Sequence, residues 1–348
     1  MLKKWFIFSV AILLSVTGCA QKDVVKEHKE KETENVEKET PTVEKFAYQA
    51  PLTGIGIKEE PNERAVAVMI NNHPSARPQS GIHKADIVYE VLAEGDITRF
   101  LAIFQSEKPE TIGPIRSARD YFIELAKGYD SFYVAHGWSP EARQILKSGS
   151  IDNINGIEYD GTLFKRASFR KAPHNSYISY DNILKGAKRV NASMDNAPTP
   201  LTFLSEKEAE SLTGKKAATA GISYSGSSLF YVEYKYDSEL KKYKRYSNGQ
   251  LTADYDTEEP VLLDNVLIVE AIHRTIDNYG RREVNLTSGG KGYLLQNGLW
   301  NEVEWKNVDD RIIPFINGKE AGLLPGKTWI NIVPSNPGLQ SIVSLKEQ

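Results

Sequence analysis

The stretch that decides the fold covers residues 86–120, DIVYEVLAEGDITRFLAIFQSEKPETIGPIRSARD. Residues 87–94 and 97–104 are rich in β-branched, aromatic and aliphatic side chains, and Gly95-Asp96 separates them. This pattern predicts two antiparallel strands joined by a two-residue turn. Side chains alternate along a strand, and both faces of this hairpin are largely apolar. We therefore expect the sheet to be covered on both sides.

Three charged side chains interrupt this apolar hairpin: Glu90, Glu94 and Arg99. With a two-residue turn and regular pairing, all three fall on one face, and Arg99 lies diagonal to both carboxylates. An unpaired charge is costly to bury, so these groups must pair or line a cleft. The sequence predicts either a structural ion-pair cluster or a site in which a carboxylate performs acid–base or ligand-binding work.

The sequence predicts a secretion signal over residues 1–19. Lys3 and Lys4 precede an apolar run, which ends in Val16-Thr17-Gly18-Cys19. This ending resembles the lipobox of bacterial lipoproteins, in which the cysteine receives a diacylglyceryl group that carries fatty acids such as palmitate. We expect Cys19 to anchor the protein at the extracytoplasmic face of the cell membrane. Cys19 is the only cysteine, which excludes disulfides, thiolate metal clusters and a cysteine nucleophile.

Residues 20–50 are dominated by Lys and Glu and contain few apolar side chains. Such a composition predicts a flexible, solvated tether between the anchor and the folded part. If this tether is coiled, it spans roughly 30 Å. The whole chain carries a formal net charge of −3, so we expect no nucleic-acid partner.

The folded part is long enough for two domains. Residues 51–190 predict an α/β (or α+β) domain with a mixed sheet, with helices over 118–127, after Ser139-Pro140 and after Ser179. Residues 191–200, NASMDNAPTP, predict a linker. Residues 201–340 predict a mostly-β domain, a small barrel or sandwich, with hairpin turns at Asn297-Gly298 and Asn317-Gly318. Residues 341–348 form the tail.

The loops of the first domain are rich in arginine and histidine, notably GPIRSARD at 113–120 and FKRASFRKAPHN at 164–175. Guanidinium groups bind carboxylate and phosphate in bidentate fashion, so convergent loops would form an anion site. The alternative is a set of solvated surface arginines. We expect neither a cofactor nor a metal, because the histidines lack zinc-ligand spacing. The candidate ligand-binding residues are Arg99, Arg116, Arg119, Arg166, His136, His174 and Asn175.

A catalytic hypothesis is based on the same hairpin. Glu94 would act as general acid, with Glu90 or Asp96 as the second carboxylate and Arg99 orienting the pair, as in glycan-cleaving enzymes. A serine hydrolase is disfavoured, because the sequence around Ser139 lacks the G-x-S-x-G elbow. The sequence contains no complete catalytic signature, so it leaves open whether the protein is an enzyme.

A string of motifs resembles one family of proteins. These motifs are NNHPSARPQSGIHKADIVYE, EGDITRFLAIF, GPIRSARDYF, HGWSPEA and APHNSY, together with PGKTWINIVP at residues 325–334. They are similar to the YerB-type lipoproteins of Bacillus and related Firmicutes, which pair N- and C-terminal domains of unknown function. The resemblance implies a two-domain, membrane-anchored lipoprotein of a Gram-positive cell. The resemblance implies no particular activity and identifies no catalytic residue.

The sequence thus favours an accessory lipoprotein of the cell envelope. Its Arg-rich cleft would bind an anionic wall component, such as peptidoglycan carboxylates or teichoic phosphates, or a protein partner. The alternative is a peptidoglycan- or glycan-cleaving enzyme that uses Glu94 as general acid.

Overall fold

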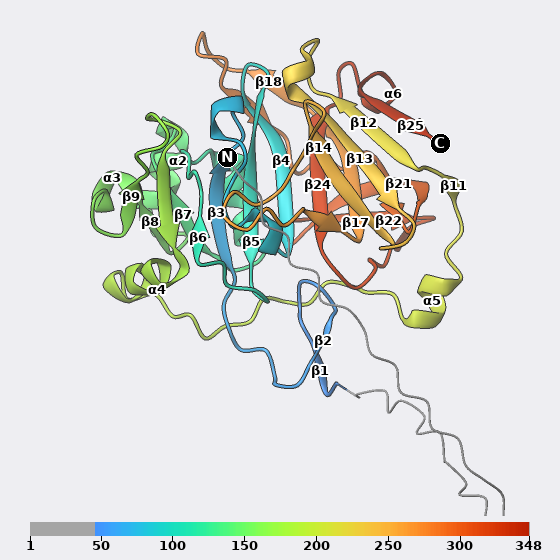
Figure 1. Cartoon of the computed structure of the whole chain (residues 1–348), viewed down its shortest axis with the longest axis horizontal. Coiled ribbons are helices and arrows are strands. Elements are labelled where there is room, and N and C mark those ends of the chain that lie inside the picture. Colours follow the sequence, from blue (N-terminus) through green and yellow to red (C-terminus); the bar gives the residue numbers. More distant parts are fainter. Residues whose placement is uncertain (1–45, 348) are drawn as a thin grey trace, which may run out of the picture. The chain divides into compact units, whose positions relative to one another are not determined.

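The computed structural model describes residues 46–347, which belong to one compact unit. The signal peptide, Cys19 and most of the expected tether lie outside the described residues. Within residues 46–347, a large mixed sheet forms the centre of the molecule (Figure 1). Its strands, from one edge to the other, are β23 (Lys319–Glu320), β22 (Arg311–Ile316), β21 (Leu299–Val308), β20 (Gly290–Gln296), β17 (Asn265–Ala271), β24 (Thr328–Pro334), β4 (Ile87–Glu94), β5 (Ile97–Phe104), β3 (Val66–Asn71), β7 (Phe132–Ala135) and β8 (Asn153–Asn155).

A single strand joins the two halves of the sequence. β24, from the C-terminal half, lies parallel to β17 on one side and to β4 on the other. Its sequence TWINIVP is buried from Thr328 to Val333, as expected for a strand covered on both faces. The expected domains 51–190 and 201–340 therefore share one sheet, and their independent folding stays a prediction. Residues 191–200 contain no helix or strand, as expected for a connection.

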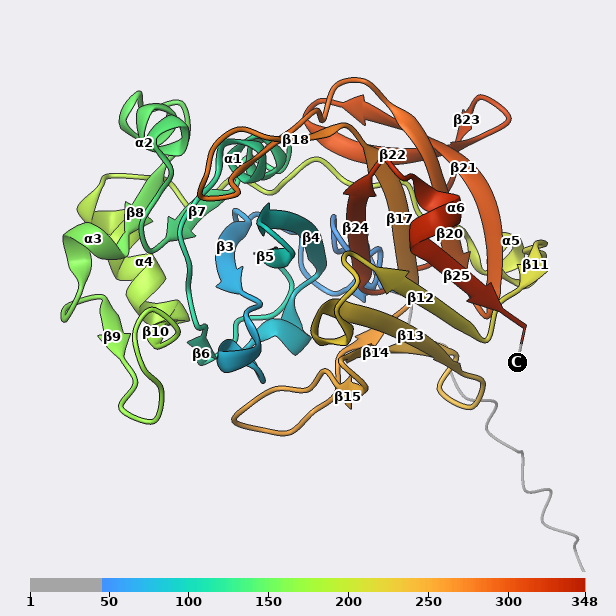
Figure 2. The ribbon, with the colours of Figure 1, turned by 90° about the horizontal axis from the view of Figure 1, so that it is seen from above.

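A second sheet covers part of one face. Its strands are β15 (Gln250–Leu251), β14 (Lys242–Ser247), β13 (Tyr231–Asp237), β12 (Thr219–Ser223) and β25 (Val343–Lys346), with β16 (Leu262–Leu263) also paired to β14. Figure 2 shows β12, β13 and β25 facing the curved strands β17 and β20 to β22. The C-terminal half is thus mostly β, as the sequence predicted, and its two sheets form a β-sandwich, one of the two alternatives named above.

Short helices and small sheets complete the described part. The helices are α1 (Asp120–Lys127), α2 (Pro140–Lys147), α3 (Gly156–Tyr159), α4 (Tyr180–Arg189), α5 (Glu206–Glu210) and α6 (Leu339–Ile342), with 3-10 turns at Pro74–Ala76, Ile82–Lys84 and Ser228–Phe230. One small sheet contains β6 (Thr111–Ile112), β10 (Ser176–Ser179) and β9 (Phe164–Arg166). A second pairs β1 (Tyr48–Gln49) with β2 (Gly56–Ile57), and a third pairs β18 (His273–Thr275) with β19 (Arg282–Val284). β11 (Lys215–Lys216) pairs with β21.

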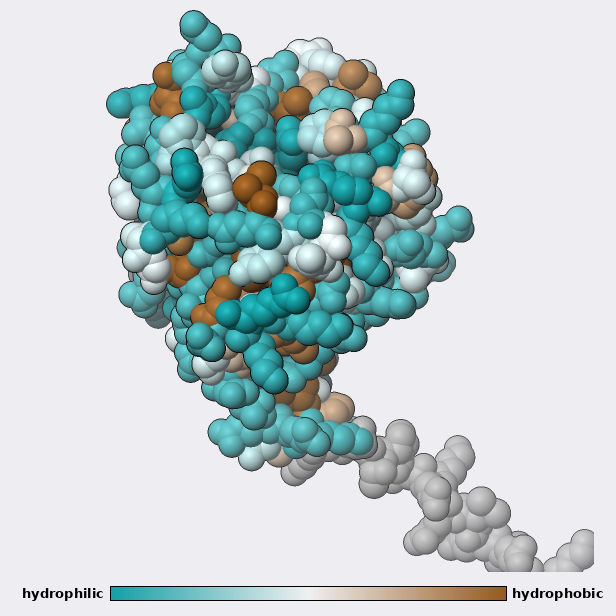
Figure 3. Space-filling view, turned by 90° about the vertical axis from the view of Figure 1, so that its left-hand side faces the viewer, coloured by the Kyte–Doolittle hydropathy of each residue, from teal (hydrophilic) through white to brown (hydrophobic). Residues whose placement is uncertain are grey.

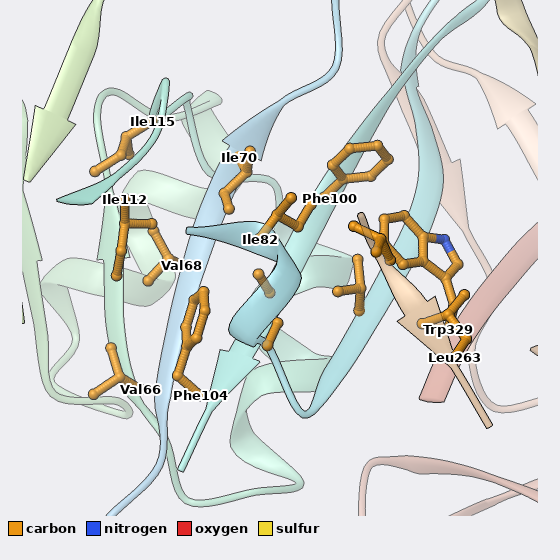
Figure 4. Close-up of a cluster of buried hydrophobic side chains, with 14 of the residues drawn as sticks. Val66, Val68, Ile70, Ile82, Phe100, Phe104, Ile112, Ile115, Leu263 and Trp329 are labelled. Carbon is orange, nitrogen blue, oxygen red and sulfur yellow. The ribbon is translucent and has the colours of Figure 1, made fainter. Parts of the chain in front are cut away.

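The buried apolar side chains form two clusters, one on each face of the large sheet. One cluster includes Ile70 and Phe100, which Figure 4 shows side by side with other members. It joins the large sheet to α4 and the second sheet. There Phe100 meets Trp329 edge to face, with ring centroids 5.0 Å apart. The other cluster includes Leu101 and packs against α1 and α2. The prediction that the hairpin is covered on both faces is confirmed.

The first residues of α1 and α2 test the helix starts that the sequence predicted. Ser139 caps α2 by accepting a hydrogen bond from the Ala142 N–H at 3.2 Å, as its Ser-Pro pattern predicted. The sequence around Ser117 and Asp120 resembles a capping box, but this prediction is wrong: α1 begins at Asp120, and its N-cap is Arg119, without a side-chain cap. The Ser117 hydroxyl instead donates to the His136 carbonyl at 3.1 Å. This contact ties the loop before α1 to the end of β7.

Candidate functional site

The hairpin contains a β-bulge, which divides its charged residues. Glu94 pairs with Ile97 across the turn, as predicted, but the register then shifts between Leu92 and Glu94. Arg99 consequently lies opposite Val91, and Glu90 lies opposite Phe100. The expectation that Glu90 shares a face with Glu94 and Arg99 is wrong. One extra residue in a strand turns the following side chains to the other face.

Glu90 lies on the face covered by the second sheet, where it is 0% exposed. Its carboxylate forms an ion pair with Arg245 of β14, with Nη2 2.8 Å from Oε2. Its oxygens also accept hydrogen bonds from the Thr98 hydroxyl at 2.9 Å and from the Trp329 indole N–H at 3.1 Å. Asn72 donates a further bond at 3.3 Å. We call these five residues the Glu90 cluster.

Arg245 is equally enclosed, at 1% exposure. Its guanidinium carbon lies 5.1 Å from the centroid of the Phe100 ring and 4.7 Å from that of Trp329. Its Nη1 donates to the Thr252 hydroxyl at 2.8 Å. A buried ion pair with satisfied hydrogen bonds on the carboxylate is typical of a structural link, here between the two sheets.

Glu94 belongs to a different cluster on the opposite face. Both of its carboxylate oxygens lie 2.6 Å from Arg99 Nη2, and Arg119 contacts the same carboxylate. The Glu94 side chain is 26% exposed, and the Arg282 guanidinium donates to the neighbouring Gly95 carbonyl at 2.9 Å. Two arginines therefore hold Glu94 beside a loop from the C-terminal half.

The separation of Glu90 from Glu94 argues against glycan cleavage by this pair of carboxylates. The two carboxyl groups of a glycosidase flank the scissile bond at about 5–10 Å from each other. Glu90 and Glu94 project from opposite faces of the sheet, and both are bound to arginine. As a pair, they do not have the geometry of a glycosidase.

A third cluster lies at the carboxyl ends of β3 and β7, which are parallel neighbours. The loop at Arg116 crosses this edge: the Arg116 N–H donates to Met69 of β3 at 2.9 Å, and its carbonyl accepts from the His136 N–H at 3.0 Å. In open α/β sheets, ligands bind outside the carboxyl ends of strands. We call Asn71, His73, Arg116, His136, Arg166 and His174 the edge site.

Arg116 is the cation of the edge site that has no partner. Within residues 46–347, its half-buried guanidinium makes neither a hydrogen bond nor an ion pair. Burial and the nearby Arg99 charge lower the pKa of Arg116 to about 10, so the group remains charged at neutral pH. A charged group left without an internal partner is suited to bind an external anion.

Two imidazoles lie near this guanidinium. His73 and His174 stack with ring centroids 4.4 Å apart. The His73 Nδ1 accepts from the Ser75 N–H at 3.1 Å, and the His174 Nδ1 lies 2.9 Å from the Asn71 amide nitrogen, a donor. In the neutral rings the proton is therefore on Nε2 of both. Burial, followed by neighbouring charges that include Arg116, lowers the pKa of both histidines.

His136 occupies the other side of the edge site. Its Nε2 lies 2.8 Å from Arg166 Nη2, which can only donate, so Nδ1 carries the proton and faces the Ser176 hydroxyl at 2.7 Å. Burial and then the Arg166 charge lower the pKa of His136 to about 4. Asp160 pairs with Arg166 at 3.0 Å. A Cβ at Gly156 would overlap the His136 ring, so glycine is needed there.

The structure thus divides the candidate ligand-binding residues into two groups. Arg116, Arg166, His136 and His174 belong to the edge site, and Asn175 lies beside it, where its side-chain oxygen accepts from Arg166 at 3.2 Å. Arg99 and Arg119 instead bind Glu94. The adjacent face of the molecule is mostly hydrophilic, with separate hydrophobic patches (Figure 3).

Sequence reasoning missed Asn71 and His73 as members of the edge site, and missed Arg245 altogether. Arg245 follows Tyr243 and precedes Ser247 at buried positions of an alternating strand. An arginine at an inward position of such a strand was the available signal. Among residues 46–347, no three His, Asp or Glu side chains come together in a way that could hold a metal ion. No helix of that range is long and apolar enough to cross a bilayer.

These observations define a class: a protein with a mixed sheet, a β-sandwich in its C-terminal half and a cationic site at one sheet edge. Residues 52–193 match the model for the N-terminal domain of a protein of unknown function, DUF3048, and residues 221–330 match the model for its C-terminal domain. The chain belongs to this family.

A related sequence and a solved structure agree with this assignment. The chain is 45% identical over 337 residues to "Putative lipoprotein YerB" of Bacillus subtilis (strain 168), covering 96% of both chains. It also resembles the crystal structure of the YerB protein from Bacillus subtilis, with a TM-score of 0.79 and 48% identity over 86% of this chain and 99% of that one. The resemblance to YerB-type lipoproteins is confirmed, and the likeness to a lipoprotein supports membrane anchoring. Lipidation of Cys19 stays a prediction.

Proposed function

We propose that this protein is an accessory lipoprotein of the cell envelope that binds an anionic wall component through its edge site. Lipidated Cys19 would hold it at the extracytoplasmic face of the membrane, where anionic wall polymers are within reach. The protein would bind its ligand without cleaving it.

One observation carries the proposal: the guanidinium of Arg116 is half-buried and has no partner within residues 46–347. The Nε2–H groups of His73 and His174 offer two further donors nearby. Asp160 is the acid that interacts with His136, and it is already bound to Arg166. Donors that outnumber acceptors favour a phosphate or carboxylate group as ligand.

The test is sedimentation of the detergent-solubilised full chain with purified cell-wall sacculi. We expect the wild type to pellet with the sacculi, and Arg116→Gln to remain mostly in the supernatant. Arg274→Gln is the matched control, because it removes one exposed arginine charge and should pellet like the wild type.

Chemical treatment of the sacculi identifies the anion. If removal of teichoic phosphates abolishes pelleting, the ligand is a phosphate polymer; if pelleting persists, peptidoglycan carboxylates are the ligand. Absence of pelleting, or equal pelleting of Arg116→Gln and the wild type, would contradict the proposal and leave a protein partner as the next candidate.

A further inference from the structure

A pocket is lined by residues of the loop that follows β3 and by residues of the C-terminal half. It has a volume of about 420 Å³ and lies between residues 72–79 and residues 245–258. This volume falls in the range of small-molecule sites, about 300–1,000 Å³. Arg116, His136 and His174 do not line it. The pocket thus combines segments from the two halves of the chain.

One polar side chain in the pocket wall is buried without a partner. Ser247, on the same face of β14 as Arg245, is 5% exposed, and its hydroxyl makes no hydrogen bond. Leaving a buried hydroxyl unsatisfied costs about 1–3 kcal/mol. Ser247 lines the pocket, so a bound ligand would supply the missing hydrogen bond.

Two basic and two acidic side chains line the pocket, and one of the basic ones, Arg77, has no counter-ion within residues 46–347. Arg77 and Arg245 line it, and Glu90 neutralises Arg245. Arg77 donates to the Asn72 and Leu229 carbonyls at 2.9 and 3.0 Å, but it pairs with no carboxylate within residues 46–347. Because a guanidinium has five N–H groups, some of its donors remain available.

Two acids line the pocket: Glu258, which is exposed to solvent, and Asp254, whose carboxylate already has partners. Asp254 accepts hydrogen bonds from the backbone N–H groups of Gly81, Asp256 and Thr257 at 2.5, 3.0 and 2.9 Å, and it faces His83 at 3.0 Å. Asp254 therefore does not pair with Arg77, and solvent screens the charge of the exposed Glu258 carboxylate. The remaining polar wall, which includes Gln79 and Thr252, suits hydroxyl groups.

From this arrangement we infer that the pocket binds a small hydroxylated carboxylate, such as a sugar acid. Its carboxylate would pair with Arg77, and a hydroxyl would bond to Ser247. This site is separate from the edge site and does not depend on the function proposed for it.

The test is calorimetric titration of the detergent-solubilised full chain with D-glucuronate, D-gluconate and neutral D-glucose. We expect at least one of the two acids to bind and glucose to bind at least tenfold more weakly, because it lacks the carboxylate. Inorganic phosphate serves as the competing anion and should bind this pocket more weakly than the acid.

Two variants locate the binding. Ser247→Ala should not lower the melting temperature, since the buried hydroxyl has no partner to lose, while it should weaken acid binding about three- to tenfold. Arg77→Gln should weaken it more than tenfold. Arg116→Gln, which impairs the edge site, should leave it unchanged.

Three results would overturn the inference. The first is that neither acid binds at millimolar concentration. The second is that glucose or phosphate binds as tightly as the acids. The third is that Ser247→Ala binds the acid as the wild type does while Arg116→Gln loses binding, which would place the acid at the edge site instead.

Discussion

The Glu90 cluster and the edge site use the same kinds of side chain in opposite ways. In the Glu90 cluster, Arg245 and Glu90 are enclosed, paired and hydrogen-bonded. In the edge site, Arg116 is half-buried and unpaired within the described residues. A satisfied buried charge is typical of a structural link, whereas an unsatisfied charge near the surface is available to a ligand.

The largest expected effect comes from opening the Glu90 cluster. Glu90→Gln leaves the Arg245 charge buried without a counter-ion, so we expect the free energy of unfolding to fall by about 3–5 kcal/mol. Denaturant titration of the wild type and the variant measures this difference. The double variant Glu90→Gln/Arg245→Met should recover part of the loss, because it removes the orphaned charge. A loss below about 1 kcal/mol would show that the ion pair is not a structural link.

Glu94→Gln tests the intermediate case, a partly exposed carboxylate between Arg99 and Arg119. We expect a loss of about 2 kcal/mol, smaller than for Glu90 because solvent screens part of the interaction. Thermal unfolding monitored by circular dichroism would measure it. If sacculi release sugar fragments with the wild type but not with Glu94→Gln, Glu94 is catalytic and the binding-only account fails.

The pH dependence of stability isolates His136, whose pKa burial lowers to about 4. The unfolded chain binds this proton more readily, since its histidine pKa is about 6.5. The contribution of neutral His136 is therefore complete above about pH 6.5 and is lost as the pH falls toward 4. Relative to His136→Asn, we expect the wild type to lose about 1–2 kcal/mol across that window, after allowance for partial exposure. Parallel pH profiles of the two proteins would contradict this assignment.

The smallest effect on stability belongs to the residue that matters most for binding. Arg116→Gln breaks no hydrogen bond or ion pair within residues 46–347, so we expect its free energy of unfolding to change by less than about 0.5 kcal/mol. Urea titration beside Arg99→Gln, which loses contacts with Glu94 and Ser117, gives the contrast. A large destabilisation by Arg116→Gln would mean that Arg116 holds the fold together.

The local signals in the sequence predicted much of this fold. The hairpin strands have the predicted bounds, Ile87–Glu94 and Ile97–Phe104. The turns at Asn297-Gly298 and Asn317-Gly318 adopt positive φ at both residues, as their composition required. These features depend on residues that are close in sequence, where propensity and alternation carry the information.

The features that sequence reasoning missed depend on contacts between distant residues. The bulge between Leu92 and Glu94 has no compositional mark in the strand, yet it moves Glu90 to the other face. Glu90 and Arg245 are 155 residues apart in the chain. The arginine-rich loops suggested an anion site, but only the tertiary structure shows that Glu94 occupies Arg99 and Arg119 and leaves Arg116 free.

The most direct test of the central claim is an NMR titration of the His73 and His174 rings against pH, with and without inorganic phosphate. An anion bound beside Arg116 stabilises the protonated imidazoles, so phosphate should raise the pKa of both histidines in the wild type and not in Arg116→Gln. If phosphate leaves both pKa values unchanged in the wild type, or raises them equally in Arg116→Gln, the edge site does not bind anions through Arg116.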